Sequence, residues 1–474
     1  MSALEETAPG PAAPALGSAS VAVNPRIRRL LEAPVLPTLL RLALPNLAEA
    51  VARVAFITLD AYFVGWLGYD ALAGASLVFP LLLLMQTMAA GAMGSGISSA
   101  IARALGGGRL NDANALVMHA VAVGLAMSGL FSLIFLPTGP ALYAAMGGVG
   151  PALEAASTYS SVIFLGAVFI WMMNTLANVL RGTGNMLVPA SAIVVAELVH
   201  VTLSPVLILG LGPAPRLGVT GAALAVILSY LAGTLVLLSY LGSGRAIVRF
   251  SWKTLRWQKR LFADILKVGA LSSLNAVQAQ ATNIALAGLI GQFGTAAIAG
   301  YGAALRLEQV QVPTIFGLGS AVVAMVGANM GAGHRLRATR IAWTGAAIGA
   351  AIGGATGLLG AVFAADWIGW FSQEPAVLKV GSLYLHILGP VYPFFGLGLI
   401  LFSASQGIGK VAGPFICSTS RLIVVAAGGW LMTDVLGSGL SGLFAVAAGA
   451  IVILGLSMAA IFKWRVNSPT PGLD

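Results

Sequence analysis

The stretch GSGISSAIARALGGG at residues 94–108 recurs in register as GSAVVAMVGANMGAG at residues 319–333. Each copy is an apolar run that ends in a glycine-rich turn, and the copies lie 225 positions apart. Four more segments recur at an offset of 225 or 226, namely LRLALP (40–45) with LKVGAL (266–271), WLGYDALAG (66–74) with QFGTAAIAG (292–300), YSSVIFLGAVF (159–169) with YLHILGPVYPF (384–394), and RGTGN (181–185) with QGIGK (406–410). Five matches in the same order indicate that the chain is an internal duplication.

The composition places both copies in a membrane. Of the 474 residues, 58% are apolar and 8% are charged, whereas soluble proteins carry about 25% charged residues. This excludes a soluble globular protein, a disordered chain and a coiled coil, and a single cysteine, Cys417, excludes a disulfide scaffold. Apolar segments long enough to cross a hydrocarbon core about 30 Å thick predict twelve spans. They run over roughly 38–66, 71–103, 113–136, 153–181, 187–211, 218–241, 262–292, 296–328, 338–363, 377–406, 412–435 and 440–464.

Each copy contains six of these spans, so both copies enter the membrane from the same side. Such a parallel repeat is typical of transporters in which two lobes rock about a site at the middle of the bilayer. We therefore predict an all-α polytopic membrane protein with twelve transmembrane helices in two six-helix lobes. The expected divisions are a disordered cytosolic tail with an amphipathic surface helix (1–35), an amino-terminal lobe (36–241), a cytosolic linker (242–261), a carboxy-terminal lobe (262–464) and a cytosolic tail (465–474).

The positive charges sort to one side of the predicted membrane. The formal net charge is +10, and 20 of the 25 lysines and arginines lie on the side of the amino terminus, whereas Arg216 and Lys379 lie on the other. Basic residues gather on the cytosolic side, so we expect an inner-membrane protein with both termini in the cytosol, and the charge does not indicate a nucleic-acid partner. Arg26, Arg28 and Arg29 belong to a short amphipathic stretch that we expect to face anionic lipid.

Three ionisable residues form a stripe on the first span. Arg53 and Asp60 follow Glu49 by four and eleven positions, which at 100° per residue places all three on one helix face. Glu49 and Arg53 are spaced for a structural ion pair within the helix. Asp60 has no basic residue one turn away, and burial favours its neutral, protonated form. We expect Asp60 to carry a coupled proton. The alternative is an aspartate that only bonds neighbouring hydroxyl groups.

The fifth span carries a second polar stripe, formed by Glu197, His200 and Ser204. Their spacings of three and seven positions place them on one helix face. A histidine changes its charge near neutral pH, so His200 can relay a proton between Asp60 and Glu197. The alternative is a histidine that is buried only for packing.

The carboxy-terminal half has no counterpart of Asp60, because the duplication aligns that position with Leu286. The two lobes are therefore expected to be chemically unequal. The second half has an acid of its own on the eighth span and a polar face on the seventh. We expect these to line a substrate cavity, and the alternative is that they bond one helix to another. The residues are Glu308, Asn275, Gln278 and Thr282.

Aromatic and basic residues near this cavity have two interpretations each. Tyr62 and Tyr301 can stack on a flat cation, so we assign them to the substrate cavity, although helix packing explains most aromatic residues in membranes. Arg306 lies two residues from Glu308 and is expected on the opposite side of the helix. Arg421 either neutralises Glu308 or repels cations, and the sequence leaves both roles open.

Four segments resemble the signatures of a known family. They are LDAYFVGWLG (59–68), SSAIARALGGGRLNDA (98–113), LRGTGNMLVPA (180–190) and VGANMGAGHRLRA (326–338). With the twelve-span duplication, they are similar to the multidrug and toxic compound extrusion (MATE) family. The resemblance implies two six-helix lobes around a V-shaped cavity. It also implies an antiporter that exports organic, often cationic, compounds against inward flow of protons or sodium ions, and it implicates Asp60 in cation coupling.

The fifth span departs from the family pattern. Similar members tend to carry NxxxDP where this chain reads HVTLSP (200–205), with His200 and Ser204 in the positions of the Asn and the Asp. A sodium ion requires several oxygen ligands, so loss of a carboxylate weakens a sodium site more than it weakens protonation of one buried acid. We therefore expect proton coupling through Asp60, His200, Glu197 and Ser204, and sodium coupling is the alternative.

Other function classes fit the sequence less well. The glycine-rich turns do not match GxxxxGK[ST] and the histidines have no metal-ligand spacing, so we expect no nucleotide, no metal and no enzymatic activity. A flippase of lipid-linked precursors needs several cations for a pyrophosphate, and the spans hold only Arg53, Arg306 and Arg421. We expect a monomer in the lipid bilayer that exports small organic cations or other amphiphilic drugs and uses an ion gradient rather than a cofactor.

Overall fold

The computed structural model describes residues 24–250 and 257–467, apart from the side chains of residues 51, 53–58, 60, 61 and 465–467. The regular elements in these ranges are helices, beginning with the short α1 (Pro25–Glu32). The amino-terminal lobe contains α2 (Val35–Gly65), α3 (Tyr69–Gln86) with the π-helical turn η1 (Thr87–Ala92) and α4 (Met93–Gly106), α5 (Leu110–Ala145), α6 (Gly150–Leu165) with α7 (Ala167–Gly182), α8 (Leu187–Leu209) and α9 (Gly218–Gly242). The carboxy-terminal lobe contains α10 (Lys259–Gly291), α11 (Thr295–Gly331), α12 (Arg335–Val362), α13 (Ala364–Gly369), α14 (Pro375–Leu388) with η3 (Gly389–Val391) and α15 (Tyr392–Ile408), α16 (Ala412–Ile423) with η4 (Val424–Gly428) and η5 (Leu431–Val435), and α17 (Gly439–Asn467).

These helices provide the twelve predicted crossings. Within the described ranges, nine helical segments are long and apolar enough to span a bilayer, and the pair α6 and α7, bent by 48°, forms a tenth. The other two crossings are α2 and α10, the first long helix of each lobe, with 31 and 33 residues. At 1.5 Å per residue, either helix exceeds the thickness of the hydrocarbon core. The prediction of an all-α membrane protein with two six-helix lobes is confirmed.

The duplication is visible in the backbone. Equivalent turns of the two lobes contain glycine with a positive φ, a conformation that favours glycine because a Cβ atom would be strained there. The equivalent pairs are Gly68 and Gly294 (φ 100° and 97°), Gly108 and Gly333 (72° and 78°), and Gly184 and Gly409 (77° and 85°). The offsets of 225 and 226 found in the sequence are therefore also those of the fold.

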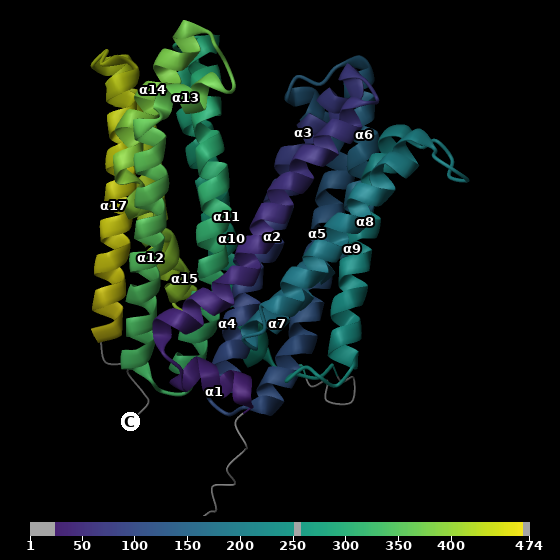
Figure 1. Ribbon diagram of the computed structural model, residues 1–474, viewed down its shortest axis with the longest axis vertical. Helices are drawn as coiled ribbons and strands as arrows, with labels where there is room; N and C mark the ends of the chain where they lie inside the picture. Colours follow the sequence, from purple (N-terminus) through teal and green to yellow (C-terminus); the bar gives the residue numbers. More distant parts are fainter. Residues whose placement is uncertain (1–23, 251–256, 468–474) are drawn as a thin grey trace, which may run out of the picture.

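The two lobes meet at one end and diverge toward the other, so the molecule has the outline of a V (Figure 1). We call the end at which they meet the α1 end, because α1 lies there, and the opposite end the open end. The helix α2 begins beside the carboxy-terminal lobe, where it contacts α11 and α12, and crosses to the amino-terminal lobe, where it packs on α8. The first long helix thus connects the two arms of the V.

The lobes touch most closely where α4 crosses α11. A Cβ atom added to Gly106 would lie 1.9 Å from the carbonyl oxygen of Ala328, and one added to Gly331 would lie 2.0 Å from the carbonyl oxygen of Arg103. The duplication relates Arg103 to Ala328 and Gly106 to Gly331, so the two contacts are reciprocal. Arg103 also donates to Asp264 of the carboxy-terminal lobe at 2.8 Å. We call the crossing at Gly106 and Gly331 the glycine seam.

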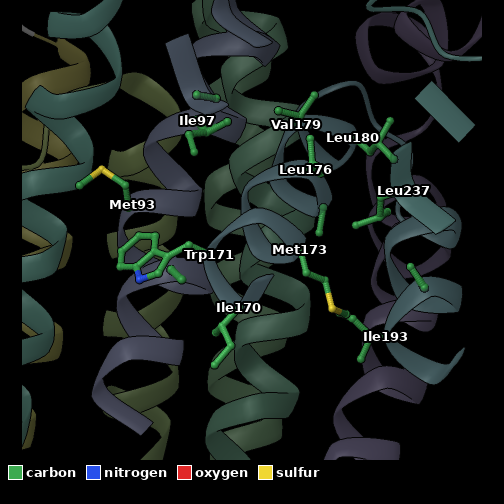
Figure 2. Close-up of a cluster of buried hydrophobic side chains, with 14 of the residues drawn as sticks. Met93, Ile97, Ile170, Trp171, Met173, Leu176, Val179, Leu180, Ile193 and Leu237 are labelled. Carbon is green, nitrogen blue, oxygen red and sulfur yellow. The ribbon is translucent and has the colours of Figure 1, made fainter. Parts of the chain in front are cut away.

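In the amino-terminal lobe, α7 forms the centre of the apolar core. Its Trp171 is fully buried, and α7 is packed by Met93 and Ile97 of α4, Ile193 of α8 and Leu237 of α9 (Figure 2). From Asn174 to Gly182 every residue of α7 is buried. A polar side chain on this segment must therefore find a partner inside the protein, because water does not reach it.

Candidate functional site

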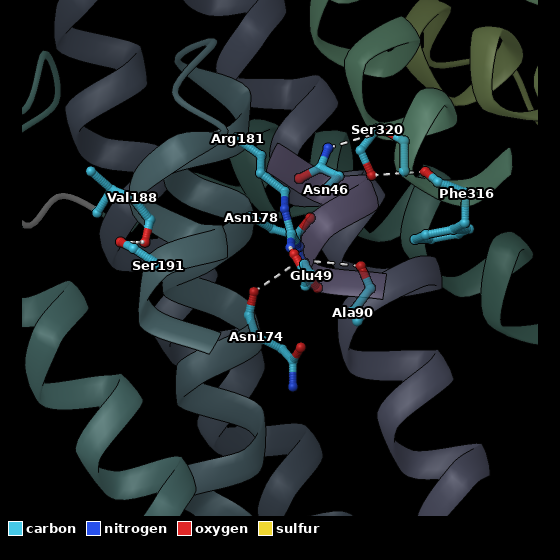
Figure 3. Close-up of polar contacts among 11 residues, drawn as sticks. Asn46, Glu49, Ala90, Asn174, Asn178, Arg181, Val188, Ser191, Phe316 and Ser320 are labelled. Atoms are coloured by element: carbon cyan, nitrogen blue, oxygen red, sulfur yellow. Dashed lines mark hydrogen bonds and ion pairs between the residues drawn. The ribbon is translucent and has the colours of Figure 1, made fainter. Parts of the chain in front are cut away.

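Polar side chains form a column on one face of α7 (Figure 3). Asn174, Asn178 and Arg181 are spaced four and three positions apart, as neighbours on a helix face are. The guanidinium of Arg181 donates from Nη2 to Glu49 Oε2 of α2 at 2.8 Å, and the two side chains are only 6% and 12% exposed. A buried ion pair therefore joins α2 to the end of α7. Removing either partner would take a counter-charge away from the other in a medium of low dielectric.

Asn178 connects this column to the irregular turn η1. Its Nδ2 donates to the carbonyl oxygen of Ala90 at 3.1 Å and to that of Asn174 at 2.9 Å. Ala90 lies in the π-helical turn η1, so this bond joins α7 to the irregular part of the second crossing. Gly94 provides the space, since a Cβ atom there would lie 2.2 Å from Asn178 Nδ2. The amide thus fixes the position at which the second crossing departs from regular helix.

The contact of Glu49 with Arg181 was missed by sequence reasoning. The expected partner was Arg53, whose side chain lies outside the described residues, and the structure pairs Glu49 with Arg181, which is 132 positions away. The repeat contained a signal for this contact. The duplication aligns Glu49 with Asn275 and Arg181 with Gln406, so two charges in one lobe are replaced together by two amides in the other. Paired replacement of this kind indicates contact.

One turn before this ion pair, α2 contacts the opposite lobe. Asn46 Nδ2 donates to the carbonyl oxygen of Gly317 on α11 at 3.0 Å. A Cβ atom added to Gly317 would lie 3.1 Å from Asn46 Cβ, so the two helices are in close contact. Successive turns of α2 therefore bind the carboxy-terminal lobe through Asn46 and the amino-terminal lobe through Glu49.

The polar stripe of the fifth crossing lies on α8, which packs along α2. His200 and Ser204 are fully buried, and Glu197 is partly buried. The backbone at Asp60 belongs to α2, but the side chain lies outside the described residues. The relay of Asp60, His200 and Glu197 therefore stays a prediction.

In the carboxy-terminal lobe, polar side chains gather around Glu308 of α11. Its Oε1 accepts a hydrogen bond from the Tyr384 hydroxyl at 2.9 Å and another from the Tyr392 hydroxyl at 3.0 Å. Both tyrosines are buried, so each hydroxyl needs this acceptor, and the carboxylate receives two donors in place of water. A small pocket beside Glu308 is lined by α10, α11, α14 and α17 together with α16, and its polar lining includes Thr282, Asn283, Tyr301 and Arg421.

The two arginines near Glu308 lie in different surroundings. Arg421 lines the pocket together with Glu308, and its guanidinium carbon lies 5.7 Å from the centre of the Phe395 ring. Arg306 is exposed, and its guanidinium carbon lies 4.8 Å from the centre of the Phe371 ring, outside that pocket. The pocket therefore contains a carboxylate and a guanidinium, and Arg306 belongs to the surface.

The remaining residues expected around a substrate cavity are dispersed. Gln278 Nε2 donates to Thr419 Oγ1 at 2.6 Å, a bond that joins α10 to α16. Asn275 is partly buried on α10, nearer the α1 end. Tyr62 is 59% exposed on α2 of the other lobe, where its ring lies 5.2 Å from that of Trp66. The members of the predicted set that share the pocket are Thr282, Tyr301 and Glu308.

Comparisons with known proteins agree with this architecture. A family profile described as MatE matches residues 45–206 and 274–431, one stretch in each lobe. An FAD transporter of Shewanella oneidensis is 28% identical over 408 residues, which cover 84% of this chain and 87% of that protein. The multidrug export protein MepA of Staphylococcus aureus is 25% identical over 388 residues, which cover 81% of this chain and 84% of that protein.

Solved structures share the fold. A MOP superfamily transporter from Pyrococcus furiosus superposes with a TM-score of 0.86 at 23% identity, over 94% of this chain and 98% of that chain. A multidrug resistance MATE family transporter in an outward-facing conformation superposes with a TM-score of 0.84 at 24% identity over the same shares.

Proposed function

This chain belongs to the MatE family, and on that premise we propose that it exports organic compounds by alternating access in exchange for protons. It is a multi-span membrane transporter and not an enzyme. The observation that carries the proposal is the match of both lobes to the family, combined with lobes that join at one end and diverge at the other. Such a shape opens at one end, and rocking of the two lobes would open a site between them at the other end instead.

The α1 end is proposed to face the cytosol. The distribution of basic residues supports this orientation, because 20 of the 25 lysines and arginines belong to the amino-terminal side of the predicted membrane. With this orientation the open end faces outward. The likeness to an outward-facing transporter over 94% of the chain supports the same assignment.

Asp60 is proposed as the proton carrier of the amino-terminal lobe. The ion pair of Glu49 with Arg181 supports this choice, because it engages the Glu49 carboxylate in a contact that joins α2 to α7. Buried His200 and Ser204 on the helix that packs along α2 support coupling to protons, since neither supplies the carboxylate that a sodium site would use. Sodium coupling is the alternative.

Amphiphilic organic cations are the first proposed substrate class, in keeping with the multidrug export protein among the relatives. Flavin dinucleotides are the second, because the FAD transporter of Shewanella oneidensis aligns with 84% of the chain.

Transport into inverted membrane vesicles tests the proposal. Uptake of a fluorescent organic cation, and separately of FAD, is measured with an acidic lumen, with a protonophore, and with a sodium gradient alone. We expect uptake to follow the pH gradient, to stop with the protonophore and to be indifferent to replacing sodium by choline. Uptake that survives the protonophore and disappears without sodium would show sodium coupling instead.

The variant Asp60→Asn keeps the size of the side chain and fixes its neutral form. We expect it to insert normally and to lose pH-driven uptake. The matched control is Asp70→Asn, which makes the same chemical change at an exposed residue in the first turn of α3. Wild-type uptake by Asp60→Asn would remove this residue from the coupling mechanism.

A further inference from the structure

The helix α1 begins on one lobe. Asn24 caps it by accepting a hydrogen bond from the Arg26 backbone nitrogen at 3.0 Å, and Pro25 occupies the first helical position. The guanidinium of Arg26 donates to the Tyr240 hydroxyl at 3.0 Å. Tyr240 belongs to α9, so the first turn of α1 is bound to the amino-terminal lobe.

The other end of α1 is bound to the opposite lobe. Asn329 of α11 donates from Nδ2 to the carbonyl oxygen of Leu30 at 2.9 Å. Arg337 of α12 donates from Nη2 to the carbonyl oxygen of Ala33, the residue that ends the helix. These carbonyl groups have no partner within a helix, because the last turn leaves them free. The carboxy-terminal lobe therefore binds α1 by its last turn.

The apolar face of α1 packs against protein. Ile27 and Leu30 are only 4% and 2% exposed. A Cβ atom added to Gly184, in the turn between α7 and α8, would lie 2.9 Å from Leu30 Cδ1. Leu30 therefore packs on the amino-terminal lobe while its carbonyl group accepts from the carboxy-terminal lobe. At the end where the lobes meet, this one residue joins both of them.

The basic face of α1 is directed away from these contacts. Arg28 pairs with Glu32 at 2.7 Å within α1, and these side chains are 68% and 62% exposed. The hydrogen bond to Glu32 and its charge raise the pKa of Arg28. Arg29 is also exposed. The basic residues of α1 therefore have different contacts, since Arg26 binds the amino-terminal lobe and Arg28 pairs within α1.

We propose that α1 is a strap that holds the α1 end closed by binding both lobes, and that it must release one of them before this end opens. The proposal rests on the alternating access proposed above. Opening requires the lobes to part beside α1, and a helix of eight residues, about 12 Å long, cannot extend to stay bound to both. The strap therefore favours the state in which the lobes are closed at the α1 end and parted at the open end. Its release accompanies the state in which the lobes are parted at the α1 end.

The test measures conformation rather than transport, so its failure differs from failure of the proposed function. Cysteines replace exposed residues on each lobe at the α1 end, Asn111 and Lys463, in a full-length chain with Cys417→Ala. Spin labels on the two cysteines report by pulsed electron resonance the fraction of molecules whose lobes are parted at this end. Arg26→Gln removes the hydrogen bond of the strap to Tyr240 of the amino-terminal lobe, and Arg337→Gln removes its hydrogen bond to the carboxy-terminal lobe at Ala33, so we call these two the release variants.

Two further variants are the matched controls. Arg28→Gln changes the same helix as Arg26→Gln, and Arg340→Gln changes an exposed residue of the same helix as Arg337→Gln. Each of the four variants removes one positive charge, so attraction to anionic lipid changes alike in all of them.

We expect each release variant to raise the ratio of parted to closed molecules about 2- to 10-fold, as loss of one hydrogen bond does. Both variants weaken the same bridge, and a bridge weakened at one end holds less at the other, so the effects of Arg26→Gln and Arg337→Gln should be less than additive when combined. The controls should match the parent chain. Release variants that match their controls, or effects that add in full, would overturn the strap. If the release variants part the lobes but the parent chain transports none of the tested compounds, the strap proposal stands and the proposed function is refuted.

Discussion

A single methyl group at the glycine seam should shift this protein toward the state that is open at the α1 end. In Gly106→Ala, the new Cβ atom would lie 1.9 Å from the Ala328 carbonyl oxygen, and in Gly331→Ala it would lie 2.0 Å from the Arg103 carbonyl oxygen. Ordinary contacts of this kind begin at 3.4 Å, so each falls short by about 1.5 Å. The clashing atoms are backbone atoms of the opposite lobe, and no side chain can rotate away. The lobes themselves must part.

The size of the shift follows from the cost of overpacking. An extra methyl group in a close-packed contact costs about 1 to 3 kcal/mol. The clash exists only where α4 and α11 touch, so the cost falls on the state that is closed at this end. A cost of about 1.4 kcal/mol changes an equilibrium tenfold, so we expect the parted fraction to rise about 5- to 150-fold relative to the closed one. The reciprocal geometry predicts similar shifts for Gly106→Ala and Gly331→Ala.

The assay is the distance between labels at Asn111 and Lys463, measured in detergent and in lipid. Alanine also favours a helix by about 1 kcal/mol over glycine, so a control must carry that effect without the clash. Gly302→Ala does so, because it lies on α11 with no atom within 4 Å of the added Cβ. A distance distribution for Gly106→Ala and Gly331→Ala that matches that of Gly302→Ala would refute the argument that the seam holds the lobes together.

Three further outcomes test the sites within the lobes. Arg181→Gln removes the guanidinium that binds the Glu49 carboxylate in a buried setting and should lower the unfolding free energy by about 3 to 5 kcal/mol, seen as a fall in the apparent melting temperature. Adding Glu49→Asn, which places at both positions the amide residues found at the equivalent positions of the other lobe, removes the remaining charge and should recover much of the loss. A double variant no more stable than the single one would exclude the ion pair as the cause. Tyr384→Phe removes a hydroxyl that donates to Glu308 and should lower the unfolding free energy by about 1.5 to 3 kcal/mol. Because Glu308→Gln removes the carboxylate that accepts this bond, Tyr384→Phe should lower the unfolding free energy less in a chain that carries Glu308→Gln. Equal losses with and without Glu308→Gln would contradict the bond. His200→Asn removes the buried imidazole that the proposed relay uses to pass a proton, so pH-driven uptake should slow about tenfold, and uptake at the parent rate would exclude His200 from the relay.

Local properties of the chain were sufficient to predict the fold. A membrane span is predicted by comparing the length of an apolar run with the thickness of the hydrocarbon core. The side of the membrane on which a basic residue lies follows from the runs between which it stands. Neither inference requires knowledge of helix packing. The duplication added the relation between the lobes. The turns at Gly184 and Gly409 repeat because equivalent sequences ended equivalent helices. These inferences each use residues that are close in the chain or aligned by one offset.

Contacts between helices depended on the tertiary structure. Sequence spacing predicted a pair of Glu49 with Arg53, whose side chain lies outside the described residues, and gave no indication that Arg181 of another helix binds Glu49. Glu308 was identified as a buried acid, but its donors Tyr384 and Tyr392 follow it by 76 and 84 positions. Which face of a helix meets which neighbour depends on rotation and depth, and a periodic pattern in one helix contains neither.

The sequence alone therefore determined that this is a duplicated twelve-span transporter with acids at membrane depth and a basic side. Only the tertiary structure decided which charges neutralise one another, where the lobes touch and what α1 binds. The amphipathic pattern of α1 indicated a surface helix, and a lipid surface and a protein groove require the same pattern. The choice between them rests on Tyr240, Asn329 and Arg337, three residues from three different helices. A buried polar group takes the partner that folding brings within reach, because water is no longer present to compete.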